Sequence, residues 1–273
     1  MKSSFTYRFV SYAFIVAQAI SAVPTASADT PSRPPESSPR QVETATKARE
    51  LGEAEKHYRR GVQFAEGDGV AQNYTTAGRF YRQAAEAGYA PAQYDLAYLY
   101  ENGLGIERDL TQAANWYRKA ADQGDAEAQN NLGTLYASGR GVPRDDTEAV
   151  RWYRLAAEQN DPEGTSNLGT MYLQGRGVQH DFAQAFQLFR RAAERGYAAA
   201  QNNLGLMYAN GHGVGRDYVW AYAWLDLAAA RISGSAEVRD RIGEKLTAAD
   251  IARARGLATR KREELAQRGR ESK

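Results

Sequence analysis

Three histidines and a series of glycine pairs are the residues of this sequence best suited to chemistry. His57, His180 and His212 stand at different offsets from their glycine pairs, and no cysteine, histidine or glutamate recurs near them at metal-ligand spacing. The chain has no cysteine, which excludes disulfides, thiolate nucleophiles and sulfur-bound zinc. The motifs G-x-S-x-G, S-x-x-K and H-E-x-x-H do not occur. We therefore predict no catalytic residue, metal or cofactor, and interpret the histidines as solvated loop residues.

The segment GHGVGRD, residues 211–217, is the nearest match to a phosphate-binding glycine loop. Such a loop leaves a β-strand and opens a helix, and its third glycine comes one residue later than Gly215 does here. This segment instead follows a helical pattern. We interpret it as a structural turn, in which glycine adopts backbone angles that other residues resist.

The glycine pairs recur at a constant step, which reveals the organisation of the chain. The step from each pair to the next is 36 residues, and alanine pairs keep the same step. The first glycines of the five pairs are Gly67, Gly103, Gly139, Gly175 and Gly211. Five units therefore run from about residue 54 to residue 233 without an insertion or deletion.

Each unit predicts two helices that pack against each other. In the third unit, apolar residues from Ala128 to Tyr136 follow helical spacing, and this first helix ends at Gly139. A second helix begins after Asp145, an N-cap with Glu148 at the capping-box position. The corresponding caps in the other units are Asn73, Asp109, Asp181 and Asp217. One first-helix column is always small, so the helices can approach closely: Gly61, Ala97, Gly133, Gly169 and Gly205.

A single helix pair has too little apolar surface to fold alone, so stacked pairs must supply the core. We predict an all-α fold, a right-handed α-solenoid of five 36-residue helix-turn-helix repeats spanning residues 49–233. Residues 234–273 change pattern and predict C-terminal capping helices with a basic tail. Ser235 is expected to cap the first of these helices, and Thr247 with Asp250 the second, from Ala248 to about residue 267.

The repeated phrase A-x-x-x-L-G-x-x-Y-x-x-G-x-G-V-x-x-D-x-x-x-A-x-x-W-Y-x-x-A-A-x-x-G resembles the Sel-1-like repeat, a relative of the tetratricopeptide repeat. Residues 90–125, 126–161 and 162–197 match it closely, and residues 54–89 and 198–233 match less well in one helix each. The resemblance covers about two-thirds of the chain. By analogy with related helical repeats, it implies that the first helices line a concave groove. Similar exported bacterial proteins include partners and inhibitors of membrane sensor kinases, envelope assembly factors and virulence-linked adaptors.

The N-terminus predicts export. Basic Lys2 and Arg8 precede the apolar residues 9–23, and Ala26-Ser27-Ala28 forms an A-x-A cleavage signal. We predict a signal peptide over residues 1–28, an uncleaved anchor being the alternative, and no stable membrane insertion after cleavage. Residues 29–48 hold four of the eight prolines and predict a disordered Pro/Ser-rich tether. Together with the resemblance, this order favours a periplasmic or secreted protein.

The charge balance excludes general nucleic-acid binding. Without Lys2 and Arg8 the 35 basic residues fall to 33, which equals the 33 acidic residues. Residues 239–273 nevertheless carry a basic excess, for which we weigh a solvated helix against weak contact with an anionic surface.

The candidate partner-binding residues are first-helix positions that vary between otherwise similar units, because repeat packing does not dictate them. They form two columns, Tyr94, Asn130, Ser166 and Asn202, and four residues later Tyr98, Thr134, Thr170 and Leu206. The neighbouring Asp95, Asn131, Asn167 and Asn203 barely vary and predict a structural hydrogen-bond ladder. Ordinary solvated helix surface is the alternative for any single member of the two columns.

Two further columns lie on the second helices. Phe80, Trp116, Trp152, Leu188 and Trp224 predict a core ladder, whereas Arg82, Arg118, Arg154 and Arg190 predict a solvated face that could still receive an acidic partner. Tyr218, Trp220 and Tyr222 form an irregular aromatic cluster, either covered by the C-terminal helices or exposed for a partner.

The sequence thus predicts a non-enzymatic scaffold or regulator of the bacterial cell envelope that binds a protein or peptide in its groove, such as a membrane sensor or another envelope protein. Neither the partner nor the oligomeric state follows from the sequence. The alternative is an enzyme acting on cell-wall or β-lactam compounds, which some cysteine-rich members of the resembling family imply. The absence of cysteine and of a nucleophile motif disfavours it.

Overall fold

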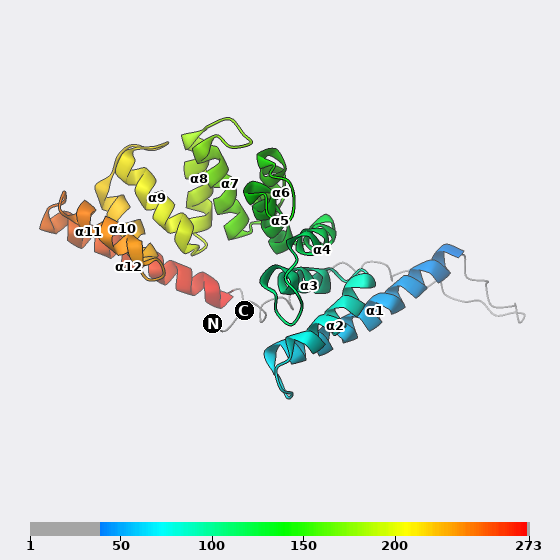
Figure 1. The fold of residues 1–273 in the computed structure, drawn as a ribbon. Coiled ribbons are helices and arrows are strands. Elements are labelled where there is room, and N and C mark those ends of the chain that lie inside the picture. The colour runs from blue at the N-terminus through cyan, green and yellow to red at the C-terminus, as the bar shows by residue number, and fades with distance from the viewer. Residues whose placement is uncertain (1–38, 272–273) are drawn as a thin grey trace, which may run out of the picture. The chain divides into compact units, whose positions relative to one another are not determined.

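The computed structural model describes residues 39–271, and this part of the chain is entirely helical, without strands. The predicted all-α solenoid of helix-turn-helix repeats is confirmed (Figure 1). The helices are α1 (Pro39–Glu66), α2 (Tyr74–Glu86), α3 (Ala90–Asn102), α4 (Leu110–Asp122), α5 (Ala126–Ser138), α6 (Asp146–Glu158), α7 (Pro162–Gln174), α8 (Phe182–Ala193), α9 (Ala198–Asn210), α10 (Tyr218–Ala228), α11 (Ser233–Gly243) and α12 (Ala248–Glu271). Among them no helix combines the length and apolarity needed to cross a membrane.

The N-terminal boundary differs from the sequence prediction. The predicted signal peptide and residues 29–38 of the predicted tether lie outside the described residues. Residues 39–48, assigned to the same tether, are instead the first turns of α1. Pro39 is tolerated at a helix start, and no further proline or glycine follows until Gly52, so alanine, lysine, glutamate and arginine can extend the helix.

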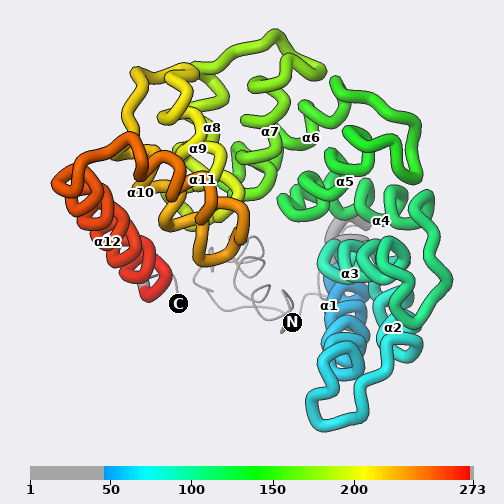
Figure 2. The backbone as a smooth tube through the Cα atoms, turned by 60° about the vertical axis from the view of Figure 1, so that its left-hand side comes forward, coloured from blue at the N-terminus to red at the C-terminus, as the bar shows by residue number. Residues whose placement is uncertain are grey.

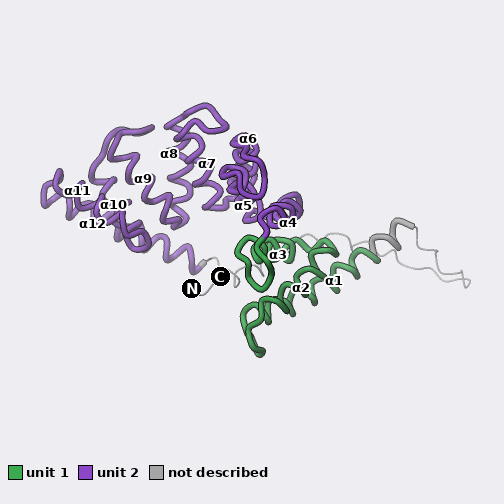
Figure 3. Tube along the Cα trace, viewed as in Figure 1, with its two compact units in different colours: residues 1–108 green, residues 109–273 purple. Residues whose placement is uncertain are grey.

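The chain divides into two compact units, residues 1–108 and 109–273 (Figure 3). The described part of unit 1 contains α1 to α3, and unit 2 contains α4 to α12. Successive helices pack against one another from α1 to α3 in unit 1 and from α4 to α11 in unit 2, as the backbone trace shows for α5 to α10 (Figure 2), and α12 packs on α10. First helices and second helices therefore alternate, and each first helix of unit 2 also packs on the second helix before it.

The helix caps form as the sequence predicts. The Asp145 side chain accepts hydrogen bonds from the backbone N–H groups of Thr147 and Glu148, the caps of α4, α8 and α10 do the same, and Asn73 accepts one bond at the start of α2. The reciprocal capping-box bond expected from Glu148 does not form, because Glu148 accepts from Arg151 and the Asp145 N–H donates to the Tyr136 carbonyl at 3.1 Å. At the other end, Gly139 stops α5 in the left-handed conformation with φ 68°. These two signals fix the length of each helix pair.

The second glycine of a loop lies against the preceding repeat where there is one, as a comparison of two such glycines shows. Gly69 and Gly105 have nearly the same positive φ, 67° and 68°. A Cβ on Gly69 would meet nothing within 4 Å, whereas one on Gly105 would lie less than 3.0 Å from Tyr74 and Thr75. The loop of one repeat thus rests on the start of the preceding second helix, and the Thr75 hydroxyl donates to the Gly105 carbonyl at 2.9 Å. The glycine pair is a structural turn, as predicted.

The small first-helix column explains the close packing inside each repeat. A Cβ on Gly133 would lie 2.8 Å from the Tyr153 ring, and one on Gly205 would lie 2.7 Å from Leu225. Both partners are buried, Tyr153 at 4% and Leu225 at 0% exposure. The ring or branched side chain of the second helix therefore occupies the space that the missing side chain leaves.

The predicted core ladder on the second helices is only partly buried. Trp152 and Trp224 are buried, but Phe80, Trp116 and Leu188 are half-buried. Neighbouring side chains cover the buried members of this column. The Arg151 guanidinium lies 4.0 Å from the centre of the Trp152 ring, whereas α12 covers Trp224.

The C-terminal helices pack on α10 and complete the core, as predicted. Ile242 of α11 and Ala254 and Ala258 of α12 are buried there. At the column of second-helix arginines, the last repeat has Asp226, which accepts from Arg239 of α11 at 2.9 Å and Arg262 of α12 at 3.0 Å. One reversed charge therefore fastens both capping helices to the last repeat.

The expected cap at Ser235 is wrong, while the second one is confirmed. Ser235 lies inside α11, is 1% exposed and donates to the Asn202 side chain at 2.8 Å. An intrahelical serine hydroxyl can satisfy a neighbouring helix instead of its own first turn. At α12 the Thr247 hydroxyl accepts from the Asp250 N–H at 3.2 Å and donates to the Asp250 carboxylate at 2.7 Å.

The aromatic cluster of α10 belongs mainly to this capped core. Tyr222 is 4% exposed and would contact a Cβ on Gly243 of α11. Trp220 stacks on Tyr208 with ring centres 6.1 Å apart, and the Lys245 ammonium lies 5.1 Å from the Tyr218 ring centre. Packing, the first of the two alternatives, accounts for these contacts.

Candidate functional site

The first predicted binding column of unit 2 lies at the seam between neighbouring helices. Asn130 and Ser166 are each 3% exposed, and Asn202 is half-buried. The Asn130 side-chain oxygen accepts from the Asn167 amide at 2.8 Å, and Asn202 accepts from Ser235. At a 36-residue step these positions face the next repeat, so Asn130 and Ser166 are joints of the solenoid and are not accessible surface contacts.

The second predicted column is more accessible. Its members Thr134, Thr170 and Leu206 are half-buried in unit 2, and Tyr98 is half-buried in unit 1. Tyr94, the unit 1 member of the first column, is also half-buried. The hydroxyls of Thr134 and Thr170 donate to the main-chain carbonyl four residues earlier in their own helices, at 3.1 and 3.2 Å. Because these hydroxyls are used within their own helices, a partner would meet mainly the methyl groups of the two threonines.

The asparagine column, predicted to be structural, is also partly accessible on the first helices. Asn131, Asn167 and Asn203 are all half-buried. They also carry hydrogen bonds, because Asn167 donates to Asn130 and Asn130 donates to Asn131 at 3.3 Å. We call the surface formed by this column and the second one the amide face; its residues are Asn131, Thr134, Asn167, Thr170, Asn203 and Leu206. The sequence signal for it was the nearly constant amide itself.

A group of acidic residues adjoins the amide face at the start of α7. The Asp161 carboxylate caps α7 by accepting from the Gly164 N–H at 2.6 Å. Burial, opposed by the Gly164 hydrogen bond and assisted by the carboxylates of Glu163, Glu127 and Asp125, raises the pKa of Asp161 to about 6. Desolvation by neighbouring atoms also raises the pKa of the Glu163 carboxyl, although the residue as a whole is exposed. Negative charge is therefore concentrated at this helix start.

Tyr197 extends this acidic corner to the start of α9. Its half-buried ring lies at the N-cap position of that helix. Burial, together with the charges of Glu163 and Asp161, raises the pKa of Tyr197 to about 12. The phenol therefore stays neutral at physiological pH and offers an aromatic ring and a hydroxyl beside two carboxylates.

The loop edge holds a set of contacts that the sequence analysis missed. The residue between the two loop glycines touches the first residue of the preceding second helix. Arg176 donates to the Asp146 carboxylate at 2.6 and 3.2 Å and to the Ala137 carbonyl at 2.8 Å. Hydrogen bonds from Arg176 and Arg144 lower the pKa of Asp146 to about 2. Opposite charges 30 residues apart were the available signal.

His212 makes the equivalent contact in the next repeat. Its ring stacks on Phe182 with ring centres 4.3 Å apart. The ring of His180 meets the same Phe182 edge-on, also with ring centres 4.3 Å apart. Interpreting His212 as a merely solvated loop residue was therefore wrong, because a flat ring on Phe182 removes apolar surface from water. Among the described residues no group of three or more histidine, aspartate or glutamate side chains could hold a metal ion.

The second-helix arginines form an outer column of mixed environment. Arg118 donates to the Tyr136 hydroxyl in unit 2, and Arg82 donates to that of Tyr100 at 2.7 Å in unit 1. Arg154 and Arg190 are exposed, as predicted for a solvated face. This column is therefore partly used to join a second helix to the first helix that follows it.

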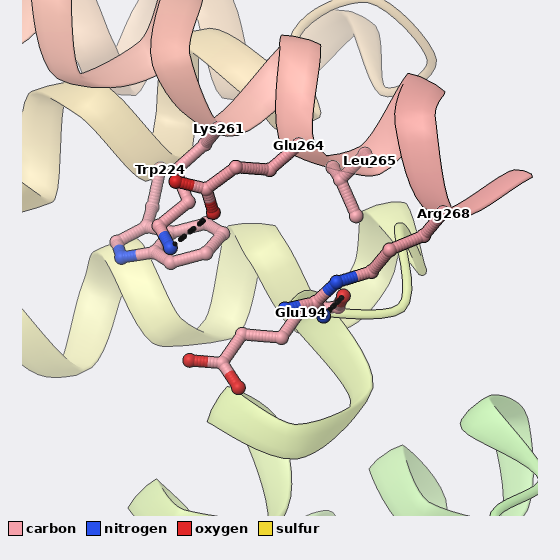
Figure 4. A pocket seen from close by; sticks show the side chains of 6 residues that line it. All are labelled: Glu194, Trp224, Lys261, Glu264, Leu265 and Arg268. Carbon is pink, nitrogen blue, oxygen red and sulfur yellow. Dashed lines mark hydrogen bonds and ion pairs between the residues drawn. The ribbon is translucent and has the colours of Figure 1, made fainter.

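The pockets of the described chain are poor sites for a small substrate. One cavity of about 10 Å³ lies between α12, Trp224 and the end of α8, where Lys261 pairs with Glu264 at 2.7 Å and Arg268 donates to the Glu194 carbonyl at 3.0 Å (Figure 4). It is about the size of one water. A larger, open cleft of about 590 Å³ lies in unit 1 between α1 and the end of α2, lined mostly by polar and charged side chains.

Stacked helix pairs, loops that clamp one repeat to the next and a polar first-helix surface define an α-solenoid repeat protein of the kind that binds other proteins. The Sel1 repeat family model matches residues 57–89, 90–125, 126–161, 162–197 and 198–232. The chain therefore belongs to the Sel1 repeat family, as its sequence resemblance indicated. Members of this family are typically protein-interaction scaffolds and generally not enzymes.

Two solved structures show the likeness directly. A Sel1 repeat protein from Oxalobacter formigenes is 37% identical with a TM-score of 0.63, over 65% of this chain and 70% of that one. A protective antigen of uropathogenic Escherichia coli strains, which displays an SLR fold, is 32% identical with a TM-score of 0.53. That match covers 84% of this chain but only 57% of the antigen. No curated protein matches the chain.

Proposed function

We propose that this protein is an exported, non-enzymatic scaffold of the bacterial cell envelope that holds a partner protein or peptide on the first-helix surface of its repeats. The observation that carries the proposal is the amide face. Its half-buried asparagines and threonines lie on three successive first helices, α5, α7 and α9, at a regular step of 36 residues. A surface repeated at regular intervals along a solenoid suits an extended partner.

Export rests on the sequence of residues 1–28, with its basic, apolar and A-x-A segments. The mass of the protein recovered from the periplasmic fraction of an expressing bacterium tests it. We expect a mass that corresponds to cleavage after Ala28. An unprocessed chain in the membrane fraction would identify the segment as an anchor instead.

Affinity capture from a cell-envelope extract tests the binding surface. The full chain is compared with Asn203→Arg, which places a long charged side chain on the amide face, and with Gln187→Arg, which places the same group on the exposed surface of α8. A partner that is retained by wild type and Gln187→Arg but lost by Asn203→Arg supports the proposal. Capture that survives Asn203→Arg rejects the amide face as the docking surface.

A further inference from the structure

The amide face has the hydrogen-bonding groups that an extended peptide needs. A chain of side-chain bonds from Asn167 through Asn130 to Asn131 holds two of its amides in fixed orientations. A side-chain amide has two donors and one acceptor oxygen with two lone pairs, so a single bond leaves it capacity for more. An extended segment has main-chain N–H and C=O groups to pair with such amides, whereas a helix uses these groups internally.

The acidic corner determines which charge the peptide should carry. Asp161 is held in place by its bond to the Gly164 N–H at 2.6 Å, and a Cβ on Gly164 would lie 3.7 Å from the Cβ of Asn130. The same Asn130 is bonded to Asn131 and Asn167, so the corner and the amide face are contiguous. Asp161 and Glu163 stand one 36-residue step after Asp125 and Glu127, and the Asn167–Asn130 bond joins the two helices, so two acidic pairs lie at neighbouring helix starts. A cationic side chain would relieve this crowding of like charge.

Tyr197 gives the corner an aromatic side. Tyr197 stands at the N-cap position of α9 as Asp161 does at that of α7, one repeat step earlier, and burial together with the charges of Glu163 and Asp161 raises its pKa. A lysine or arginine side chain that pairs with the carboxylates can rest its methylenes or its charge against the ring. Carboxylates beside an aromatic ring therefore favour a basic side chain over a neutral or acidic one.

We propose that the amide face binds an extended basic peptide, with its main chain along Asn131, Asn167 and Asn203 and a lysine or arginine side chain at Asp161, Glu163 and Tyr197. This inference rests on the proposed scaffold function and names the chemical class of the partner. The three asparagines recur once per repeat on α5, α7 and α9, so the peptide lies across the first helices. The charge of the corner sets its preference, and the amides contribute contacts that do not depend on its side chains.

Fluorescence anisotropy with two labelled octapeptides tests the charge preference on the purified full chain. One peptide alternates lysine and serine, and the other alternates glutamate and serine. We expect the lysine peptide to bind more tightly, with an affinity that falls as salt rises. Glu163→Gln and Asp161→Asn should each weaken this binding about three- to tenfold, a modest partly exposed charge interaction. Asparagine at position 161 remains a good helix cap, so α7 is retained.

Matched controls separate the site from a general charge effect. Glu158→Gln makes the same charge change on the exposed surface of α6 and should leave the affinity unchanged. Asn203→Ala should weaken binding about threefold by removing hydrogen bonds, whereas Asn115→Ala, on the exposed surface of α4, should not. Equal effects of Glu158→Gln and Glu163→Gln, no binding of the lysine peptide, or tighter binding of the glutamate peptide would each overturn the inference.

The two proposals fail in different ways. If the envelope partner depends on Asn203 but the lysine peptide does not bind, the scaffold function stands and the basic-peptide class is wrong. If the lysine peptide binds as described but no envelope protein is captured through the amide face, the peptide site stands and the envelope role fails. Circular dichroism of each variant confirms that it is folded before binding is compared.

Discussion

Replacing the second loop glycine by alanine separates two reasons for which the repeat needs glycine. Gly69→Ala and Gly105→Ala both place a methyl group on a residue of unit 1 with a φ near +68°. The left-handed conformation costs a non-glycine residue about 1–2 kcal/mol, and this cost is common to both variants. The unfolded-state entropy lost by replacing glycine is also common to both.

Only the second variant meets a steric clash. The new methyl of Gly69→Ala would have no neighbour within 4 Å, whereas that of Gly105→Ala would lie less than 3.0 Å from main-chain atoms of Tyr74 and Thr75. Main-chain atoms at a helix start cannot rotate away, so the loop must shift and weaken its bond to the Thr75 hydroxyl. Overpacking of this kind costs about 1–3 kcal/mol. We therefore expect a loss of about 1–2 kcal/mol for Gly69→Ala and about 2–5 kcal/mol for Gly105→Ala.

Urea unfolding followed by circular dichroism measures the difference between the two variants. Because both positions are in the same unit, a change in cooperativity affects them alike. Equal destabilisation would refute the argument, since backbone conformation alone would then explain the glycine and the loop would not be clamped on the preceding helix. Greater destabilisation by Gly69→Ala would refute it more strongly.

Three further predictions concern charged groups. The pKa of Asp146 is lowered to about 2, so its pairing with Arg176 stabilises the fold above about pH 4, and this stabilisation is lost as pH falls toward 2. Acid titration by circular dichroism should therefore show a smaller acid-induced loss of stability for Arg176→Ala than for wild type, and an unchanged profile would contradict the ion pair. The pKa of Asp161 is raised to about 6, so the folded protein binds an extra proton between about pH 4 and 6 and loses stability as pH rises through this range. Asp161→Asn should flatten this dependence of stability on pH, which the midpoints of urea unfolding at several pH values would detect. Asp226→Ala leaves Arg239 and Arg262 without their shared carboxylate and should lower the free energy of unfolding by about 1–3 kcal/mol. Hydrogen exchange in α11 and α12 should accelerate, and unaltered exchange there would mean that apolar packing alone holds these two helices on α10.

Much of the fold was predictable because it depends on local rules repeated five times. A left-handed glycine such as Gly139 ends a helix, a carboxylate such as Asp145 starts the next one, and Gly133 leaves room for the Tyr153 ring. Each rule acts within one repeat and uses residue types with strong conformational preferences. Repetition then converts weak local signals into a definite architecture.

The candidate site was less predictable because its exposure depends on neighbours distant in sequence. Asn130 and Asn131 are adjacent in the chain and identical in type, yet the first is 3% exposed and the second half-buried. A helix turns about 100° per residue, so one amide faces the next repeat and the other faces outward. Variability pointed to Asn130, the buried member of the pair, since a joint between repeats can vary as long as its partner accommodates it.

The sequence by itself determined the repeat, the family and the ends of the helices inside the repeats, because caps, glycines and apolar spacing act over a few residues. Tertiary structure alone decided which amides face outward, how Arg176 joins Asp146 across 30 residues, and that Tyr197 is half-buried. Burial and charge crowding depend on what packs nearby in space, and that follows only once the repeats have stacked.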